Sequence, residues 1–264
     1  MKNRINHTFA ICAYKESPFL EECIISLKEQ KRKSEIIMVT STPNQLISDM
    51  AEKYSIPLYI NEGESGITQD WNYAYKKAKT KYVTIAHQDD VYLPDYSRWI
   101  VNEIEKKKKA IIAFTGYGEL RNDKVVVDNK MLKIKRLMLS PLKISLFQSS
   151  KFVRRRILSF GCPICCPAVT YVKANLPNQV FTPGFRSDED WQAWEKLSKR
   201  KGEFIYISKV GMYHRIHEES ETSVILNDDA RKEEDYCMFR KFWPKPIASI
   251  LARLYAESEK SNQL

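Results

Sequence analysis

The 264-residue sequence lacks any apolar run that approaches the roughly 20 residues needed to span a bilayer. Residues 1–8 are polar and show no apolar core of a signal peptide. The chain is therefore expected in the cytoplasm, where its six cysteines would stay free thiols. Cys162 and Cys165 form a lone C-x-x-C without the second pair or the spaced histidines of a structural zinc site. Buried or site-lining thiols are favoured.

Acidic side chains are absent from residues 129–186. The basic residues of this segment are Lys130, Lys133, Lys135, Arg136, Lys143, Lys151, Arg154, Arg155, Arg156, Lys173 and Arg186. They account for the whole net charge of +10, and such a patch suits a polyanion: substrate phosphates, anionic lipid or nucleic acid. Within the segment, 131–146 and 151–158 fit either basic amphipathic helices at an anionic membrane or ordinary helices packed on the domain.

Two further absences bear on function. Aromatic residues do not interleave with the basic ones, as a stacking platform for nucleic acid would require. The basic segment makes a non-enzymatic nucleic-acid-binding protein one alternative, but without such a platform no nucleic-acid partner is expected. Glycine is missing from Tyr14-Lys-Glu-Ser-Pro18, the turn after the first expected strand. Nucleotidyltransferases, the other alternative, usually carry a glycine-rich basic loop there.

Short apolar stretches alternate with helical patterns through the first half of the chain. Strands are expected at 8–13, 34–40, 56–60, 82–86 and 110–114, and helices at 19–30, 43–54, 68–78 and 94–104. This order predicts an α/β fold with a parallel sheet between layers of helices. Later strands are expected before Tyr171 and at 205–207. A helical C-terminal part is expected at 228–254, with a break at Trp243-Pro-Lys-Pro246.

The most informative stretch begins with the buried strand 82–86, which runs directly into His87-Gln88-Asp89-Asp90. Two neighbouring carboxylates thus follow the carboxyl end of a strand, where open α/β sheets bind ligands. Mg²⁺ and similar hard cations prefer carboxylate oxygens together with substrate phosphates. The pattern fits a metal–diphosphate site, and it also fits an acidic turn that caps the next helix.

A second acidic group, Asp188-Glu189-Asp190, follows Ser187 at the start of an expected helix. Ser187 with an acid three residues later resembles a capping box, so helix capping is one interpretation. The other is a general base at Asp190 that takes a proton from an attacking hydroxyl. Trp191 and Trp194 could stack on a sugar, although their helical spacing favours core packing.

In chain order, the motifs between residues 8 and 222 resemble those of family-2 glycosyltransferases with the GT-A fold. Ala13-Tyr14-Lys15-Glu16 resembles the family's Pro-x-Tyr-Asn turn at the nucleotide base. Gly66-Ile-Thr-Gln-Asp-Trp-Asn72 resembles its Gly-x-Ser-x-x-Arg-Asn helix start. Ala86-His-Gln-Asp-Asp90 resembles its Leu-Asp-x-Asp-Asp metal motif, and Glu189-Asp190-Trp191 its Glu-Asp pair. Arg215-Ile-His217 with Ser220 resembles its late Arg-x-His-x-x-Ser loop.

The resemblance implies an inverting transfer of a sugar from a nucleotide-diphosphate sugar to a cell-surface polysaccharide or lipid-linked glycan. It implies Asp190 as the catalytic base, and Mg²⁺ or Mn²⁺ held by Asp89, Asp90 and His217. The implied donor contacts are Ala13, Tyr14, Glu16, Thr40, Gly66, Asp70, Asn72, His87, Asp89 and Arg215. The implied acceptor contacts are Cys165, Glu189 and Trp191.

The expected organisation is a glycosyltransferase domain at 1–222 with a Rossmann-like, mostly parallel sheet. Its nucleotide-binding half is 1–118, and its acceptor half 119–222 holds the basic helical insertion 129–158. A helical extension follows at 223–264. The enzyme is expected on the cytoplasmic side, with a peripheral contact to an anionic membrane surface.

Two departures from the family pattern stand out. His87 occupies the place of the first Asp of the metal motif. Thr40-Ser41-Thr42-Pro43 replaces the usual Asp-Asp-Gly-Ser after the second strand. The second departure removes an acidic contact to the base or ribose, and it argues against a standard uridine donor.

Overall fold

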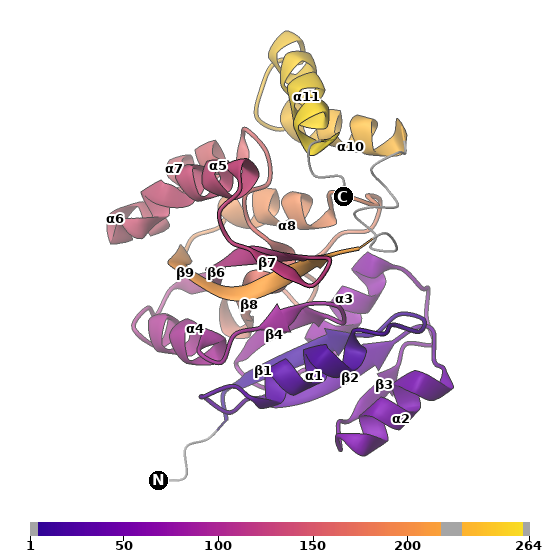
Figure 1. The fold of residues 1–264 in the computed structure, drawn as a ribbon. Coiled ribbons are helices and arrows are strands. Elements are labelled where there is room, and N and C mark those ends of the chain that lie inside the picture. Colours follow the sequence, from indigo (N-terminus) through magenta and orange to yellow (C-terminus); the bar gives the residue numbers. More distant parts are fainter. Residues whose placement is uncertain (1–4, 218–228, 261–264) are drawn as a thin grey trace.

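A nine-stranded mixed sheet organises the computed structural model, which describes residues 5–217 and 229–260 (Figure 1). The strand order is β3-β2-β1-β4-β8-β6-β9-β5, and β7 pairs with β6. The strands are β1 His7–Cys12, β2 Glu35–Thr40, β3 Leu58–Ile60, β4 Tyr82–His87, β5 Val91–Tyr92, β6 Ala110–Arg121, β7 Lys124–Val126, β8 Val169–Val172 and β9 Glu203–Ile216.

The half of the sheet from β3 to β4 is parallel, as the β-α order predicts. β1 pairs in parallel with β2 and with β4, and β2 pairs in parallel with β3. Beyond β4 the pairing becomes mixed, because β8 runs antiparallel to both β4 and β6. Side chains alternate between the two faces of β1, so that Ala10 joins one core while Phe9 and Ile11 join the other.

Helices cover both faces of the sheet. On one face, α1 (Leu20–Lys28), α2 (Gln45–Lys53) and α4 (Tyr96–Glu105) pack around Phe9 and Ile11. On the other face lie α3 (Ile67–Lys77), α7 (Lys151–Leu158) and α8 (Glu189–Ser198). The C-terminal helices α10 (Asp229–Arg240) and α11 (Lys245–Lys260) contribute Phe239 and Ala248 to this second core. They therefore extend the main core instead of forming their own.

β6 and β9 are longer than the sequence pattern indicates. The sequence pattern ends the strand that corresponds to β6 near Phe114 and predicts a loop at residues 213–217. In the structure β6 continues to Arg121 and β9 continues to Ile216, and the two strands pair in parallel. Glycine lowers the strand propensity of this part of β6. The structure shows why glycine occurs there: a Cβ on Gly118 would lie 2.9 Å from Val127 Cγ1 and 3.0 Å from the Tyr213 ring.

Three helix starts differ from the prediction. α2 begins after Asn44, whose side chain accepts a hydrogen bond from the Ile47 amide, so the helix does not include Pro43. α3 begins after Gly66, whose φ of 148° suits glycine alone, so Thr68 is not the cap. α8 begins after Asp188, and Ser187 Oγ donates instead to Glu234 of α10 (2.6 Å). The capping-box interpretation of Ser187 is therefore wrong.

The acid-free segment forms α5 (Lys130–Leu139), the 3₁₀ turn η1 (Ser140–Lys143), α6 (Ser145–Gln148) and α7 beside the sheet (Figure 1). Its inner face is packed on the domain, with Leu132, Leu139 and Leu142 buried. Its outer face leaves Leu137 and Leu146 exposed. The segment is thus a set of packed amphipathic helices with apolar side chains remaining on the surface.

Among residues 5–217 and 229–260, no helix is both long and apolar enough to cross a bilayer. All six cysteines fall within these ranges and are free thiols. Cys162 and Cys165 are half-buried and belong to no group of potential metal ligands in the described ranges. The two thiols of the lone C-x-x-C are thus free and half-buried.

Trp191 and Trp194 show how α8 is fixed. Both side chains are fully buried, which contradicts the predicted acceptor contact of Trp191 and confirms the core interpretation. Trp191 Nε1 donates to the Leu158 carbonyl at the end of α7 (3.0 Å), whereas Trp194 Nε1 has no hydrogen-bond acceptor among the described residues. The two indoles are therefore a matched pair that differs in one hydrogen bond.

We expect Trp191→Phe to lower the free energy of unfolding by about 1–3 kcal/mol more than Trp194→Phe. Both variants lose a similar volume, but only the first leaves a buried carbonyl without its donor. Urea unfolding of the two variants and the wild type measures the difference. Equal losses would contradict the assignment of the Trp191 bond as a tether between α7 and α8.

Candidate active site

The Asp89–Asp90 turn lies where the two halves of the sheet meet. β4 ends at His87, and the chain then turns into β5, which pairs antiparallel with β9 through Val91 and Tyr213. The last residues of β9 therefore run alongside the turn. As a result, three of the chain's four histidines, His87, His214 and His217, surround the two carboxylates.

Asp90 is fully buried and joins the turn to β9. Its Oδ1 accepts hydrogen bonds from His214 Nδ1 and from the Arg215 amide, both at 2.9 Å. Burial alone would lower the pKa of His214, but the charges of Asp90 and Asp89 outweigh it and raise this pKa to about 9. His214 is therefore an imidazolium at neutral pH and serves as the counter-charge of Asp90.

Asp89 is held from two directions. Its Oδ2 lies 3.1 Å from His217 Nε2, and its carbonyl accepts from Arg215 Nε at 2.9 Å. Burial opposes the charge of Asp89, but the bond to His217 and the nearby His87 and His214 lower its pKa. The carboxylate therefore stays ionised, and its side chain is 18% exposed.

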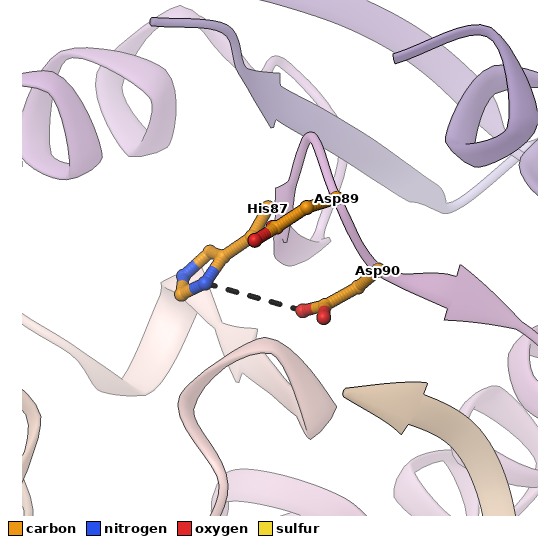
Figure 2. A group of neighbouring side chains, drawn as sticks. All are labelled: His87, Asp89 and Asp90. Atoms are coloured by element: carbon orange, nitrogen blue, oxygen red, sulfur yellow. Dashed lines mark ion pairs between the residues drawn. The ribbon is translucent and has the colours of Figure 1, made fainter. Parts of the chain in front are cut away.

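His87, Asp89 and Asp90 offer a set of metal ligands. Figure 2 shows the three side chains pointing toward one another from the turn, and one ligand atom from each lies within 4.8 Å of the others. Asp90 Oδ2 and His87 Nε2 are buried without a hydrogen-bond partner among the described residues. His87 Nδ1 faces Asp90 Oδ2 at 4.0 Å. Because a buried carboxylate oxygen without a partner is costly, a divalent cation that takes up its lone pair fits this site.

The protonation state of His87 agrees with that role. Its ring stacks on Trp71 with 5.2 Å between centroids, and burial lowers its pKa although Asp90 and Asp89 oppose the shift. A neutral imidazole can offer a nitrogen lone pair to a cation. His217, also predicted as a ligand, contacts Asp89 directly and is placed to orient that carboxylate.

Asp190 stands at the start of α8, on the other side of the site. Its side chain is half-buried, with Oδ1 accepting from the Trp191 amide (2.5 Å) and Oδ2 facing Cys162 Sγ at 3.7 Å. Burial raises the pKa of Asp190 to about 6, although the Trp191 amide and the charge of Lys135 oppose the shift. A carboxylate with this pKa is ionised at neutral pH and basic enough to accept a proton.

Lys135 and Cys165 lie between the two acidic groups. The Lys135 amine donates to Tyr117 Oη (2.9 Å) and is near enough to influence the pKa of both His214 and Asp190. Cys165, predicted at the acceptor, is half-buried; burial raises the pKa of its thiol, and Asp90 and Asp190 both add to the rise. Both acidic groups therefore lie within electrostatic range of Cys165, and Lys135 within range of His214 and Asp190.

The loops after β1 and β4 are tied together. The side-chain amide of Gln88 accepts from the Tyr14 amide (3.0 Å) and donates to the Tyr14 carbonyl (2.8 Å). The Lys15 amide donates to Thr42 Oγ1 after β2 (2.6 Å). Among the predicted donor residues here, Ala13 and Thr40 are buried, and Tyr14 and Glu16 are exposed. The carboxyl ends of β1, β2 and β4 thus form one rim.

Asp70 extends this rim to β3. Its carboxylate accepts from Ser41 Oγ (2.6 Å) and from Asn61 Nδ2 (2.8 Å), so it joins α3 to the ends of β2 and β3. Gly66 gives α3 its start just before it. A cavity of about 790 Å³ opens beside these residues and is lined in part by Asn61, Asn72 and Lys173. The residues that line it do not include His87, Asp89 or Asp90.

Two predicted donor residues form hydrogen bonds that hold neighbouring segments in place. Asn72 Oδ1 accepts from the Val180 and Phe181 amides, and its Nδ2 donates to the Phe181 carbonyl, so the amide anchors a neighbouring loop. Arg215 is buried, and its guanidinium binds the Asp89 carbonyl and the carboxylates of Glu22 and Asp123. Both are positioning residues, because the protein already occupies their polar atoms.

Three residues near the acidic groups are not among the residues that the sequence motifs predicted for the site. Gln88 has a position between the metal-motif residues but no charge, Lys135 is one of many lysines in the acid-free segment, and Cys162 is one half of a lone C-x-x-C. Glu189 is buried beside Asp190 at the start of α8. Ser220, predicted in the late loop, lies outside the described residues.

The sequence matches the family model described as Glycosyl transferase family 2 over residues 8–172, more than half of the chain. It is 27% identical to an uncharacterized glycosyltransferase of Rickettsia prowazekii over 240 residues, which cover 88% of this chain and 70% of that protein. An uncharacterized glycosyltransferase of Rickettsia typhi is 26% identical over 226 residues, covering 82% and 66% of the two chains.

Solved structures share the fold. TarS 1–349 of S. aureus in complex with UDP-GlcNAc aligns with a TM-score of 0.66 and 16% identity over 94% of this chain and 70% of that one. A mannosyltransferase from Pyrobaculum calidifontis in complex with GDP-Man and Mn²⁺ aligns with a TM-score of 0.62 and 15% identity. The alignment covers 97% of this chain and 70% of that one. Glucosyl-3-phosphoglycerate synthase from Mycobacterium tuberculosis in complex with Mn²⁺ and UDP-Glc aligns with a TM-score of 0.59 and 12% identity. The alignment covers 91% of this chain and 80% of that one.

At these identities the structural likeness concerns the fold, and it confirms the predicted GT-A architecture with its C-terminal helices. The match to the family model covers the turn with its two carboxylates and the rim that surrounds it. The chain is an enzyme that belongs to glycosyl transferase family 2.

Proposed function

We propose that this enzyme moves a sugar from a nucleotide-diphosphate sugar to a hydroxyl of a glycan acceptor with inversion at the anomeric carbon. The observation that carries the proposal is the arrangement of His87, Asp89 and Asp90 on one side of Cys165 and Asp190 on the other. This arrangement supplies a cation site and a proton acceptor within one site, and both are required for a direct displacement.

We assign the following roles in the reaction to these residues. His87, Asp89 and Asp90 would hold Mn²⁺ or Mg²⁺, which supplies charge stabilisation to the leaving diphosphate. The imidazole nitrogen favours Mn²⁺, because Mg²⁺ prefers oxygen ligands. Asp190 accepts the proton of the attacking hydroxyl. His214 and Lys135 supply positive charge close to where the diphosphate would lie.

A direct displacement also agrees with the state of the thiols. Burial raises the pKa of Cys162, Cys165 and Cys166, so all three are protonated at neutral pH. A protonated thiol is a poor nucleophile, so the cysteines do not favour a covalent sugar intermediate. Cys162 faces Asp190 at 3.7 Å, and the half-buried Cys165 is the cysteine that we propose to contact the acceptor.

The donor rim supports a nucleotide. Related structures were solved with UDP-GlcNAc, GDP-Man and UDP-Glc, and we propose a donor of this class. Tyr14 is exposed next to the ends of β1 and β4, where a base could stack on its ring. Asp70 brings a carboxylate to the end of β2, next to the position where the family's acidic motif is missing.

The proposed acceptor is a cell-surface polysaccharide or lipid-linked glycan, extended on the cytoplasmic side of a membrane. Residues 1–118 would bind the nucleotide, and residues 119–222 would receive the acceptor around Cys165 and Glu189. The nucleotidyltransferase and nucleic-acid-binding alternatives receive no support from the family match.

The metal assignment predicts that Asp89→Asn abolishes the stabilisation of the protein by Mn²⁺. At a hundred times its Kd, an ion bound only to the folded state adds about 2.7 kcal/mol to the free energy of unfolding. Thermal unfolding with and without Mn²⁺ measures this gain. Asp95→Asn is the matched control, because Asp95 pairs with Lys31 and Arg98 outside the cluster. An unchanged Mn²⁺ effect in Asp89→Asn would remove Asp89 from the site.

The base assignment predicts that Asp190→Asn lowers turnover by roughly 10²–10⁴ while donor affinity hardly changes. In the wild type, kcat/KM should fall as the pH drops below about 6, because protonation of Asp190 removes the base. The melting temperature should change little, since an amide oxygen can still accept from the Trp191 amide. Near-normal turnover with a lower melting temperature would instead indicate a purely structural Asp190.

Lys135 should keep Asp190 ionised at lower pH. We expect Lys135→Met to raise the pH at which activity is lost, so that turnover falls by roughly three- to tenfold at pH 6 and little at pH 8. Lys133→Met on the same helix is the control, because Lys133 is exposed and pairs with Asp128. Identical pH profiles for the two variants would exclude this role for Lys135.

A further inference from the structure

Three basic stretches that are far apart in the sequence meet at one end of the sheet. Residues 106–109 connect α4 to β6, residues 143–156 span α6 and α7, and residues 199–201 connect α8 to β9. Each is rich in lysine or arginine. Because β6 and β9 run in parallel with Ala110 opposite Glu203, the first and third stretches lie side by side at the amino ends of these strands.

Hydrogen bonds join the stretches into one surface. Lys107 Nζ donates to Ser145 Oγ at the start of α6 (2.6 Å). The buried Arg154 of α7 donates to the carbonyls of Arg200 (2.8 Å) and Gly202 (2.9 Å). The Glu203 amide donates to the Lys109 carbonyl (2.9 Å). Main-chain and side-chain contacts thus fix the spacing of the basic residues.

We define the basic face as the exposed lysine and arginine residues of these stretches that form no ion pair with a described residue. They are Lys108, Lys109, Lys143, Lys151, Arg156, Arg200 and Lys201, and all are exposed. Other lysines nearby are already neutralised: Lys107 lies 3.7 Å from Glu203 and Lys199 lies 2.6 Å from Glu195. Seven positive charges therefore remain without a protein counter-charge in the described part of the chain.

Large apolar side chains stand among these charges. Ile144, Leu146 and Phe152 are 54%, 76% and 71% exposed, which is unusual for such residues in one region. The Arg156 guanidinium lies 5.7 Å from the centre of the Phe152 ring, so charge and apolar surface are in direct contact. Exposed apolar side chains bordered by lysine and arginine are typical of surfaces that bind anionic membranes.

We propose that the basic face docks on an anionic phospholipid bilayer, with Ile144, Leu146 and Phe152 entering the headgroup region. A nucleic-acid partner explains the charge but not the aliphatic Ile144 and Leu146, because base stacking needs aromatic rings. A bilayer explains both. The proposal concerns a surface outside the catalytic site and does not rest on the proposed reaction.

The location of the face leaves the catalytic site free. Figure 1 shows α6 and the start of β9 at the same end of the sheet. His214 and His217, by contrast, follow at the carboxyl end of β9. At about 3.3 Å per residue, the strand between Glu203 and His214 spans up to about 35 Å. A docked enzyme would therefore keep its donor rim and cation site away from the lipid surface.

Co-sedimentation of the full chain with vesicles tests the proposal. We expect binding to phosphatidylcholine vesicles that contain phosphatidylglycerol, loss of this binding as salt is raised, and little binding to pure phosphatidylcholine. The variant with Lys143→Ala, Lys151→Ala and Arg156→Ala should bind about a hundredfold more weakly. Leu146→Ser with Phe152→Ser should also weaken binding at unchanged charge.

The matched control removes three exposed lysines elsewhere: Lys53→Ala, Lys76→Ala and Lys124→Ala. It should bind nearly as the wild type does, and melting temperatures establish that all variants fold. Equal weakening in the control would reduce the effect to net charge and overturn the proposal. Equal binding to both kinds of vesicle, or none at low salt, would overturn it too. Tighter binding to duplex DNA than to anionic vesicles, unaffected by Leu146→Ser with Phe152→Ser, would assign the face to nucleic acid instead.

Discussion

The hydrogen bonds of Asp90 hold the site together. A fully buried carboxylate is costly unless it is paired, and Oδ1 receives both the His214 ring and the Arg215 amide. These bonds join a turn after β4 to a strand that lies 124 positions later in the chain. Arg215 then binds the Asp89 carbonyl, so both carboxylates are fixed relative to β9. The direction of the carboxylate oxygens, and therefore the proposed cation site, depends on this connection.

Neighbouring charges and burial together explain the shifted pKa values of the site. Asp89 and Asp90 face the imidazolium of His214, whereas Asp190 is more isolated and its pKa rises through burial. Lys135 lies between the two acidic groups and limits that rise. One type of side chain could therefore serve the two functions proposed above: the low pKa of Asp89 suits cation binding, and the raised pKa of Asp190 suits proton acceptance.

The two departures from the family pattern have structural counterparts. His87 replaces an acid and stacks on Trp71, which leaves a neutral nitrogen beside two carboxylates instead of a third negative charge. At the end of β2, the acid that is missing from Thr40-Ser41-Thr42-Pro43 is matched by Asp70, whose carboxylate reaches Ser41 from α3. At the first place the charge therefore differs from the family pattern, and at the second a buried carboxylate from α3 lies beside the turn, held by Ser41 and Asn61.

The sequence alone determined the features that depend on neighbouring residues: the β-α order, the burial of the parallel strands and the two carboxylates at the end of β4. Periodicity and turn chemistry act over a few residues, so a single sequence reveals them. Only the tertiary structure decided that β9 continues to Ile216 despite the glycines of β6, because pairing between the strands outweighs local propensity. It also decided that Trp191 packs in the core and that Asn72 and Arg215 position loops, because their partners are distant in the sequence. The position of Lys135 beside Asp190, and the meeting of three basic stretches at one end of the sheet, likewise follow from long-range packing that no local pattern encodes.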